Sequence, residues 1–84
     1  MLGDHSSEIP AAFGKVLRRH RLAAGLSQEQ LGLEAGVQRN FISLIELGQN
    51  QPTISTIIKL AWALRLPAQQ LVGETETELN ATAR

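Results

Sequence analysis

The feature that most constrains this sequence is a pair of short helical segments between Ser27 and Leu47, each with its own boundary signals. Ser27 and Gln30 have the spacing of a capping box, in which two side chains bond the free N–H groups at a helix start. The first segment ends at Gly36 and the second before Gly48, because glycine supports the left-handed backbone that closes many helices. Segments this short are not stable alone, so they must pack against other helices.

Helix signals continue on both sides of this pair, whereas the sequence shows no alternating strand pattern with a hairpin turn. The expected helices cover residues 10–24, 28–35, 38–47, 54–65 and 67–72. The positions expected to face inward on the fourth helix are Ile54, Ile57, Leu60, Ala61 and Leu64. Gly32 lies inside the second helix, where it is about 1 kcal/mol less favourable than alanine, and this indicates a neighbour packed closely against it.

These elements predict an all-α fold, a compact five-helix domain formed by residues 10–72. Residues 1–9 are expected to be a flexible acidic segment, and residues 73–84 a polar acidic tail or a frayed helical extension. A chain of 84 residues holds one such domain, which buries only modest apolar surface, so dimerisation would add to its stability.

Several function classes are excluded by what the sequence lacks. Without cysteine there is no disulfide framework and no thiolate metal site. No apolar run approaches the roughly 20 residues that span a bilayer, and the polar first residues are not a secretory signal, so we expect a cytoplasmic protein. Neither histidine has a carboxylate partner at a recognisable spacing, and no phosphate loop is present. We therefore expect neither an enzyme nor a protein that needs a cofactor or a small-molecule ligand.

The formal net charge is zero, but the charges are unevenly distributed along the chain. Residues 10–72 carry seven basic and three acidic residues, a net charge of +4. The two flanking segments carry −2 each. The predicted domain is therefore basic, which suits an anionic partner, although a basic face on a helix can also be a solvated surface.

Residues at fixed spacing along the domain carry a family resemblance. They read GLSQEQLG at 25–32, AGV at 35–37, FIS-x-IE-x-G at 41–48, and Pro52. This series resembles the phage-repressor/Cro-like (XRE) helix-turn-helix family, over roughly residues 13–72. The resemblance implies a lambda-repressor-like fold and a transcriptional regulator that binds double-stranded DNA sequence-specifically, with residues of about 38–47 as the helix that enters the major groove.

The outward face of that helix carries side chains suited to reading bases. Arginine can bridge O6 and N7 of guanine, and asparagine or glutamine can bridge N6 and N7 of adenine. The expected base contacts are Gln38, Arg39, Asn40, Ser43 and Leu44. Leu44 departs from the family pattern, which usually has a polar residue there. It is either a contact to a thymine methyl group or a surface leucine without a role.

Further residues are expected to hold the DNA backbone or the scaffold. The candidate backbone contacts are Ser27, Gln28, Arg18, Lys15, Asn50 and Gln51. For Arg18 and Lys15 a solvated surface is an equally good interpretation. Glu46 would repel phosphate, and the resemblance implies that it instead forms a structural ion pair with Arg21.

The fourth and fifth helices carry more apolar surface than a small monomer needs. Ile58, Trp62, Arg65 and Leu66 are the expected dimer interface. A homodimer would place two recognition helices about 34 Å apart, on a palindromic operator. The alternative is that Trp62 covers the core of a single chain.

Two functions follow from these observations. The first is a stand-alone regulator, such as a restriction-modification controller, a phage repressor or a small antitoxin. The second is a protein-interaction module of the same fold, antitoxin-like, with weak or no DNA binding. The zero net charge and Leu44 and Leu47 favour the second, whereas Arg39 on a basic domain favours the first.

Overall fold

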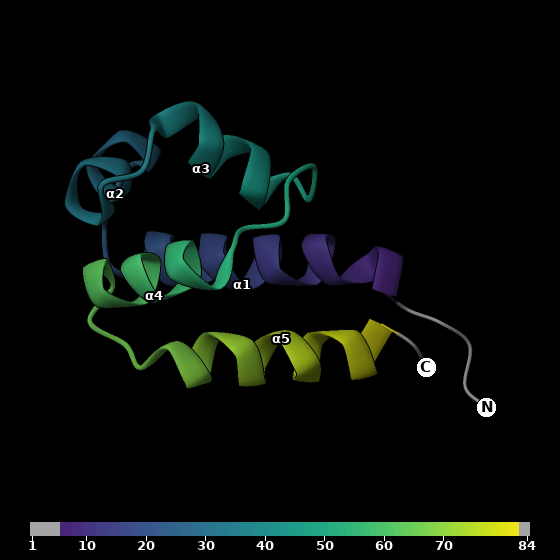
Figure 1. Ribbon diagram of the computed structural model, residues 1–84. Coiled ribbons are helices and arrows are strands. Elements are labelled where there is room, and N and C mark those ends of the chain that lie inside the picture. Colours follow the sequence, from purple (N-terminus) through teal and green to yellow (C-terminus); the bar gives the residue numbers. More distant parts are fainter. Residues whose placement is uncertain (1–5, 83–84) are drawn as a thin grey trace.

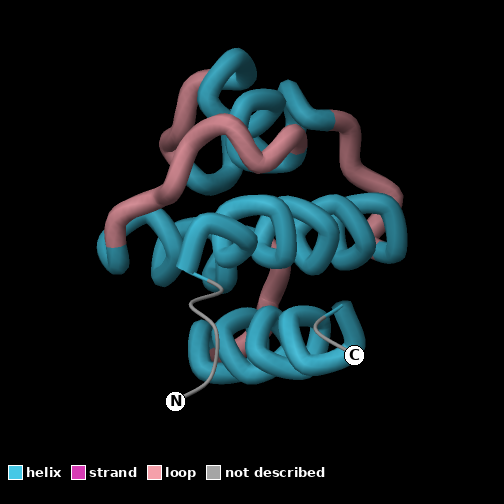
Figure 2. The backbone as a smooth tube through the Cα atoms, turned by 90° about the vertical axis from the view of Figure 1, so that its right-hand side faces the viewer, coloured by secondary structure: helices cyan, strands magenta, loops and turns pink. Residues whose placement is uncertain are grey.

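The computed structural model describes residues 6–82, and every regular element in this range is helical. The elements are η1 (Ser6–Glu8), α1 (Ile9–Ala23), α2 (Gln28–Ala35), α3 (Arg39–Glu46), α4 (Ile54–Ala63) and α5 (Ala68–Thr82). The helices α2 and α3 cover one side of α1 and α4, while α5 lies along the opposite side (Figure 1; Figure 2). The expected five-helix, all-α architecture is confirmed.

One hydrophobic core lies between these layers. Its largest fully buried side chains are Val16, Leu17, Leu31, Ile42, Ile45, Leu60 and Leu71. Each of the five α-helices contributes at least one of them. Full burial of one such side chain stabilises the fold by about 1.5–3 kcal/mol. Detaching any one of the five helices would expose part of the core and lose this stabilisation.

Two glycines allow helices and turns to approach closely. A Cβ atom on Gly32 would lie 2.4 Å from the carbonyl oxygen of Val37, so the close neighbour expected there is confirmed. A Cβ atom on Gly14 would lie 2.4 Å from the carbonyl oxygen of Ile45. Gly14 therefore sets how closely α1 approaches α3, a role that helical spacing alone did not indicate.

Of the two forms expected for the C-terminal segment, a tail or a helical extension, the structure has a helix. The last helix continues through residues 73–82 instead of ending at Val72. Leu71 and Thr75 are buried against the rest of the molecule, and the Thr75 hydroxyl donates to the carbonyl oxygen of Leu71 over 2.8 Å. Burial of this face, together with ion pairs to α1, stabilises a segment whose polar composition suggested a tail.

Smaller differences concern the helix ends. Helix α1 begins at Ile9, one residue before the expected Pro10, and residues 6–8 form the short helix η1. Residues 1–5 of the expected flexible segment lie outside the described residues. Ile54 is 71% exposed and does not face inward, because it lies at the first position of α4, beyond the core.

Candidate nucleic-acid interface

The turn between α2 and α3 is built by local interactions. Ser27 Oγ accepts the backbone N–H of Gln30 at 3.0 Å, and Gln30 Oε1 accepts the backbone N–H of Ser27 at 2.8 Å. Gly36 ends α2 with a φ of +70°, and the N–H of Val37 then donates to Gly32 at 2.8 Å. The capping box and the glycine turn hold α2 and α3 in a fixed relation.

Helix α3 has one buried and one exposed side. Ile42 and Ile45 are fully buried. The exposed residues at its start are Gln38, Arg39 and Asn40, while Ser43 and Leu44 are half-buried. Gln38 is the N-cap rather than the first helical residue, and its side chain makes no capping hydrogen bond. The five expected base contacts thus lie on α3 or directly before it, and α3 belongs to the outer layer of the molecule (Figure 1).

Arg21 and Glu46 lie together at the junction of α1 and α3. Arg21 Nε donates to Glu46 Oε2 at 2.6 Å, and Nη2 donates to Oε1 at 3.0 Å. The two side chains are only 8% and 4% exposed. The hydrogen bonds that Arg21 donates to Glu46 raise the pKa of Arg21 above its ordinary value, against the lowering effect of burial. The negative charge of Glu46 is therefore paired within the protein, which reduces its repulsion of a DNA phosphate.

Helix α2 also bonds to this ion pair, which was not expected from the sequence. Gln28 Nε2 donates to Glu46 Oε1 at 3.1 Å, and Arg21 Nη1 donates to the carbonyl oxygen of Leu26 at 2.9 Å. Gln28, expected at the DNA backbone, is thus also part of the scaffold. The side-chain hydroxyl of Ser27, another expected backbone contact, is the acceptor of the α2 cap.

A cleft of about 370 Å³ opens beside α3. The basic residues of α1 differ in whether they line this cleft. Arg18 lines it together with Arg21, Gln28, Ser43, Glu46 and Leu47. Lys15 points elsewhere, because its ammonium lies 3.9 Å from a carboxylate oxygen of Glu78 on α5. Of the remaining expected backbone contacts, Gln51 is exposed and Asn50 half-buried in the loop after α3.

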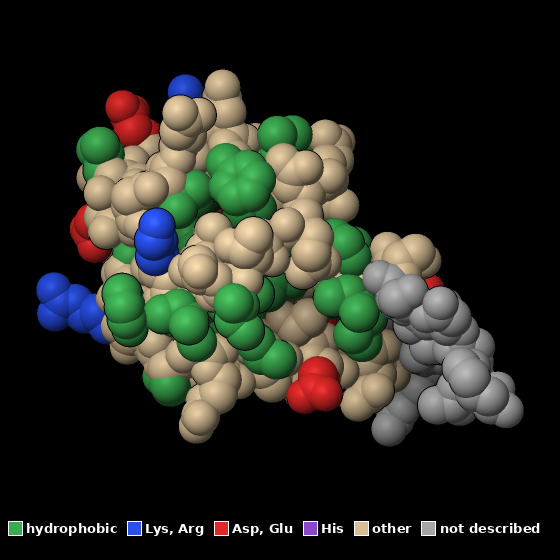
Figure 3. Space-filling view, viewed as in Figure 1, with side chains coloured by type: hydrophobic (Ala, Val, Ile, Leu, Met, Phe, Trp, Pro, Cys, Tyr) green, Lys and Arg blue, Asp and Glu red, His purple; other side chains and the backbone are tan. Residues whose placement is uncertain are grey.

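The expected dimer residues lie on α4 and in the turn between α4 and α5. Trp62 is 73% exposed and Arg65 is exposed, while Ile58 and Leu66 are half-buried. Figure 3 shows hydrophobic side chains gathered over α4 and along its border with α5. Trp62 therefore does not cover the core of its own chain, which removes the alternative interpretation of this residue.

A polar cluster between α1 and α5 was not expected from the sequence. Glu74 accepts from Gln70 at 2.9 Å and from Arg19 at 3.0 Å, and it lies 2.9 Å from His20 Nε2. These hydrogen bonds lower the pKa of Glu74 from 4.5 to about 2. His20 thus has a carboxylate partner after all, one that lies 54 positions along the chain and shows no local spacing.

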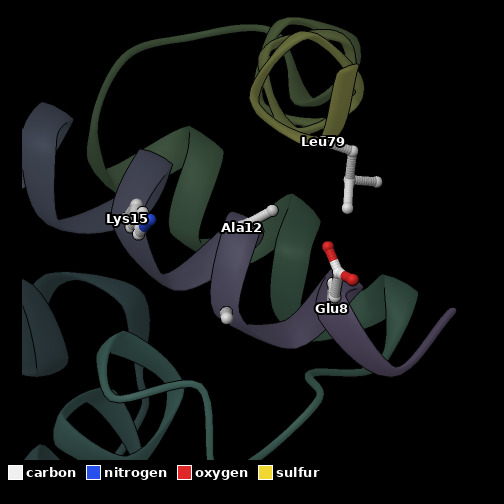
Figure 4. A pocket seen from close by; sticks show the side chains of 5 residues that line it. Glu8, Ala12, Lys15 and Leu79 are labelled. Carbon is white, nitrogen blue, oxygen red and sulfur yellow. The ribbon is translucent and has the colours of Figure 1, made fainter. Parts of the chain in front are cut away.

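A second opening lies where α1 begins and α5 ends. Glu8, Ala11, Ala12, Lys15 and Leu79 line a space of about 270 Å³. Glu8 and Leu79 project into it from opposite sides (Figure 4).

Within residues 6–82 no group of His, Asp and Glu could hold a metal ion. None of the helices in that range is both long and apolar enough to cross a bilayer.

Comparison with known proteins supports one assignment. A family model described as helix-turn-helix matches residues 17–71. An HTH-type transcriptional regulator of Sinorhizobium fredii is 33% identical over 63 residues, which cover 75% of this chain and 82% of that protein. The control protein C.BamHI of Bacillus amyloliquefaciens is 32% identical, over 83% of this chain and 88% of that protein.

A solved structure extends this similarity to three dimensions. The restriction-modification controller protein C.AhdI of Aeromonas hydrophila superposes with a TM-score of 0.73 and 39% sequence identity. The match covers 74% of this chain and 94% of that one. On the matches of the family model, of the relatives and of this solved structure, the chain belongs to the phage-repressor/Cro-like helix-turn-helix family of transcriptional regulators.

Proposed function

We propose that this protein regulates transcription by binding double-stranded DNA sequence-specifically in the cytoplasm, with α3 in the major groove. The observation that carries this proposal is the exposed edge of α3. Gln38, Arg39 and Asn40 are exposed there, while Ile42 and Ile45 hold the opposite side of the same helix in the core. A helix anchored in this way presents its first residues to a ligand without rearrangement of the domain.

The chemistry of these three side chains suits base edges. Arg39 offers the two parallel donors that match guanine, and Asn40 and Gln38 each offer a donor and an acceptor that match adenine. Each bidentate contact of this kind discriminates against the wrong base by about 1–3 kcal/mol. Arg18, in the cleft beside α3, would take a backbone phosphate and fix the register of the helix.

We further propose that the protein acts as a homodimer on a palindromic operator. Trp62 is exposed on the apolar surface of α4 and α5, and tryptophan is among the residues that contribute most to interfaces. A twofold dimer through this surface presents two α3 helices to successive major grooves, about 34 Å apart. The similarity to two controller proteins supports a stand-alone regulator of this kind.

The test is selection of bound duplexes from a random pool, followed by gel-shift titration with the enriched sequence. We expect a palindromic sequence with half-sites one helical turn apart. Arg39→Ala should weaken binding by about 1–3 kcal/mol and relax the preference at one base pair per half-site. Arg19→Ala is the matched control, because it removes an equal charge that bonds Glu74 on the α5 side.

Two outcomes would count against the proposal. No enrichment at low salt would favour the protein-interaction module, which the exposed Leu47 also suits. Equal weakening by Arg39→Ala and Arg19→Ala on every sequence would show that only the charge of the domain matters.

A further inference from the structure

The outward surface of α4 and α5 has an apolar centre and unpaired charges of both signs, Arg65 and Glu76 among them. Trp62 and Val72 are 73% and 42% exposed in the apolar part. Arg65 and Glu76 are both exposed, and within residues 6–82 neither has a hydrogen bond or an ion pair. Every other acidic side chain of α5 in this range bonds to a neighbour, so Glu76 stands out.

Helical spacing places Glu76 on the apolar flank of α5. Glu76 lies four residues after Val72, so the two share one side of the helix. Gln70 and Glu74, which are bonded to each other, lie on the other flank, where Glu74 contacts α1. Figure 2 shows α5 beneath both α1 and α4, so the flank away from the α1 contacts borders α4.

Arg65 has an unusual backbone for its residue type. It ends α4 with a φ of +60°, and the N–H groups of Arg65 and Leu66 donate to Trp62 and Ala61 as in a Schellman motif. Glycine has the positive φ at the ends of α1, α2 and α3, at Gly25, Gly36 and Gly48. An arginine in a conformation that favours glycine indicates that its side chain has a use.

The direction of the dimer axis follows from the fold. Helices α4 and α5 run antiparallel, with α3 on the far side of α4 from α5 (Figure 1). Two copies can present both α3 helices to one duplex only if the twofold axis runs across α4 and α5 toward α3. Rotation about that axis brings the α4–α5 turn of one copy next to the opposite end of the same helix pair in the other copy. That opposite end is where α4 begins and α5 ends. Arg65 is at the turn, and Glu76 is eight residues, about 12 Å, along α5 from Ala68.

We propose that the partner on this surface is a second copy of the chain, and that Arg65 of each copy pairs with Glu76 of the other. The inference rests on the proposed function, which requires both α3 helices to face one duplex. The twofold axis doubles the pair, so two opposite-charge contacts flank the apolar centre around Trp62. The pair sets the register of the dimer, and thus the spacing of the half-sites.

A charge exchange tests this pairing on the full chain by sedimentation equilibrium at low salt. Arg65→Glu and Glu76→Arg alone each create two like-charge contacts, and each should raise the dimer dissociation constant by about tenfold or more. The double variant Arg65→Glu/Glu76→Arg should regain the wild-type constant. A mixture of the two single variants should form heterodimers, because both of their contacts again join opposite charges. Glu34→Arg, on α2, is the control and should leave the constant unchanged.

The outcomes separate this inference from the proposed function. A dimeric wild type whose single reversals have no effect, or whose double variant stays weak, overturns the pairing and leaves DNA binding untouched. A wild type that stays monomeric at micromolar concentration with its selected DNA overturns the dimer itself. Arg65→Gly adds a readout that a structural role would not give. At concentrations where the chain is monomeric it should keep or raise resistance to urea, since glycine suits the backbone, and at higher concentrations it should still weaken the dimer.

Discussion

Glu46 is a carboxylate on the helix that we propose to lie against DNA, and its neighbours explain why that charge is tolerated. Arg21 holds it with two hydrogen bonds and Gln28 with a third. The three side chains come from α1, α2 and α3. The main effect of these hydrogen bonds is to fix how the three helices are oriented, because the net stabilisation by a buried ion pair is small once desolvation is subtracted. Removing one partner is a different matter, since it leaves the other charge buried and alone.

This asymmetry gives the first prediction. Arg21→Met or Glu46→Leu alone should lower the free energy of unfolding by about 3–5 kcal/mol, because each leaves an uncompensated buried charge. The double variant should lose clearly less than the sum of the two. Urea titrations followed by circular dichroism measure all three. Additive losses would show that the residues act separately and that the pair does not organise the junction.

Only part of this site could be predicted at the residue scale. The capping box of Ser27 and Gln30 depends on four consecutive residues, so spacing was enough to find it. The bond from Gln28 to Glu46 depends on where two side chains 18 positions apart point, which a local pattern does not determine.

At the scale of elements, the close approach of α1 to α3 at Gly14 determines how α3 is held. Nothing lies within 4 Å of a Cβ atom placed on Gly73, whereas one on Gly14 would meet backbone atoms of Ile45 and Glu46. Both glycines lie inside helices. The same substitution therefore has opposite consequences at the two positions.

We expect Gly14→Ala to destabilise the protein by about 1–3 kcal/mol, since the backbone of α3 must shift to make room. Gly73→Ala should stabilise it by about 0.5–1 kcal/mol, because alanine loses less entropy in a helix. Thermal unfolding of the two variants measures this difference. Gly14→Ala should also weaken operator binding, as α3 is displaced. Equal effects on stability at both sites would contradict the close approach of α1 and α3.

The contact between α1 and α5 has a pH dependence whose direction follows from Glu74. Its pKa of about 2 in the folded protein lies below the ordinary 4.5, so the folded state favours the charged form. The stabilisation is complete above about pH 4.5 and is lost as the pH falls toward 2. Glu74→Gln should therefore flatten this part of the stability profile, measured by urea unfolding between pH 7 and pH 2.5. Glu34→Gln, an exposed carboxylate on α2, is the control and should leave the profile unchanged.

The same contact explains why the end of α5 could not be predicted. The polar composition of residues 73–84 predicts a tail or a frayed helical extension, and no local pattern indicates a partner for Glu74 or Glu78. Their partners Lys15 and Arg19 are on α1, more than 50 positions away. Long-range pairing of this kind is visible only once the helices are packed.

At the scale of the whole molecule, the fold divides the charges between two surfaces. The overall charge is zero, yet carboxylates of α5 pair with Lys15 and Arg19, whereas Arg18 lines the cleft next to α3. The five-helix architecture could be predicted because its start and stop signals are local. This division could not, because it depends on which side of α1 each cation occupies.

The division predicts how salt affects DNA binding. The logarithm of the binding constant falls with the logarithm of salt concentration by about 0.9 for each phosphate that a cation neutralises. Arg18→Ala should therefore reduce the slope by about 0.9 per subunit, or about 1.8 for a dimer. Lys15→Ala should reduce it less, because its ammonium already lies 3.9 Å from Glu78. Fluorescence anisotropy with the selected operator at several salt concentrations gives both slopes. A larger change for Lys15→Ala would mean that DNA displaces Glu78, and that α5 competes with the operator for α1.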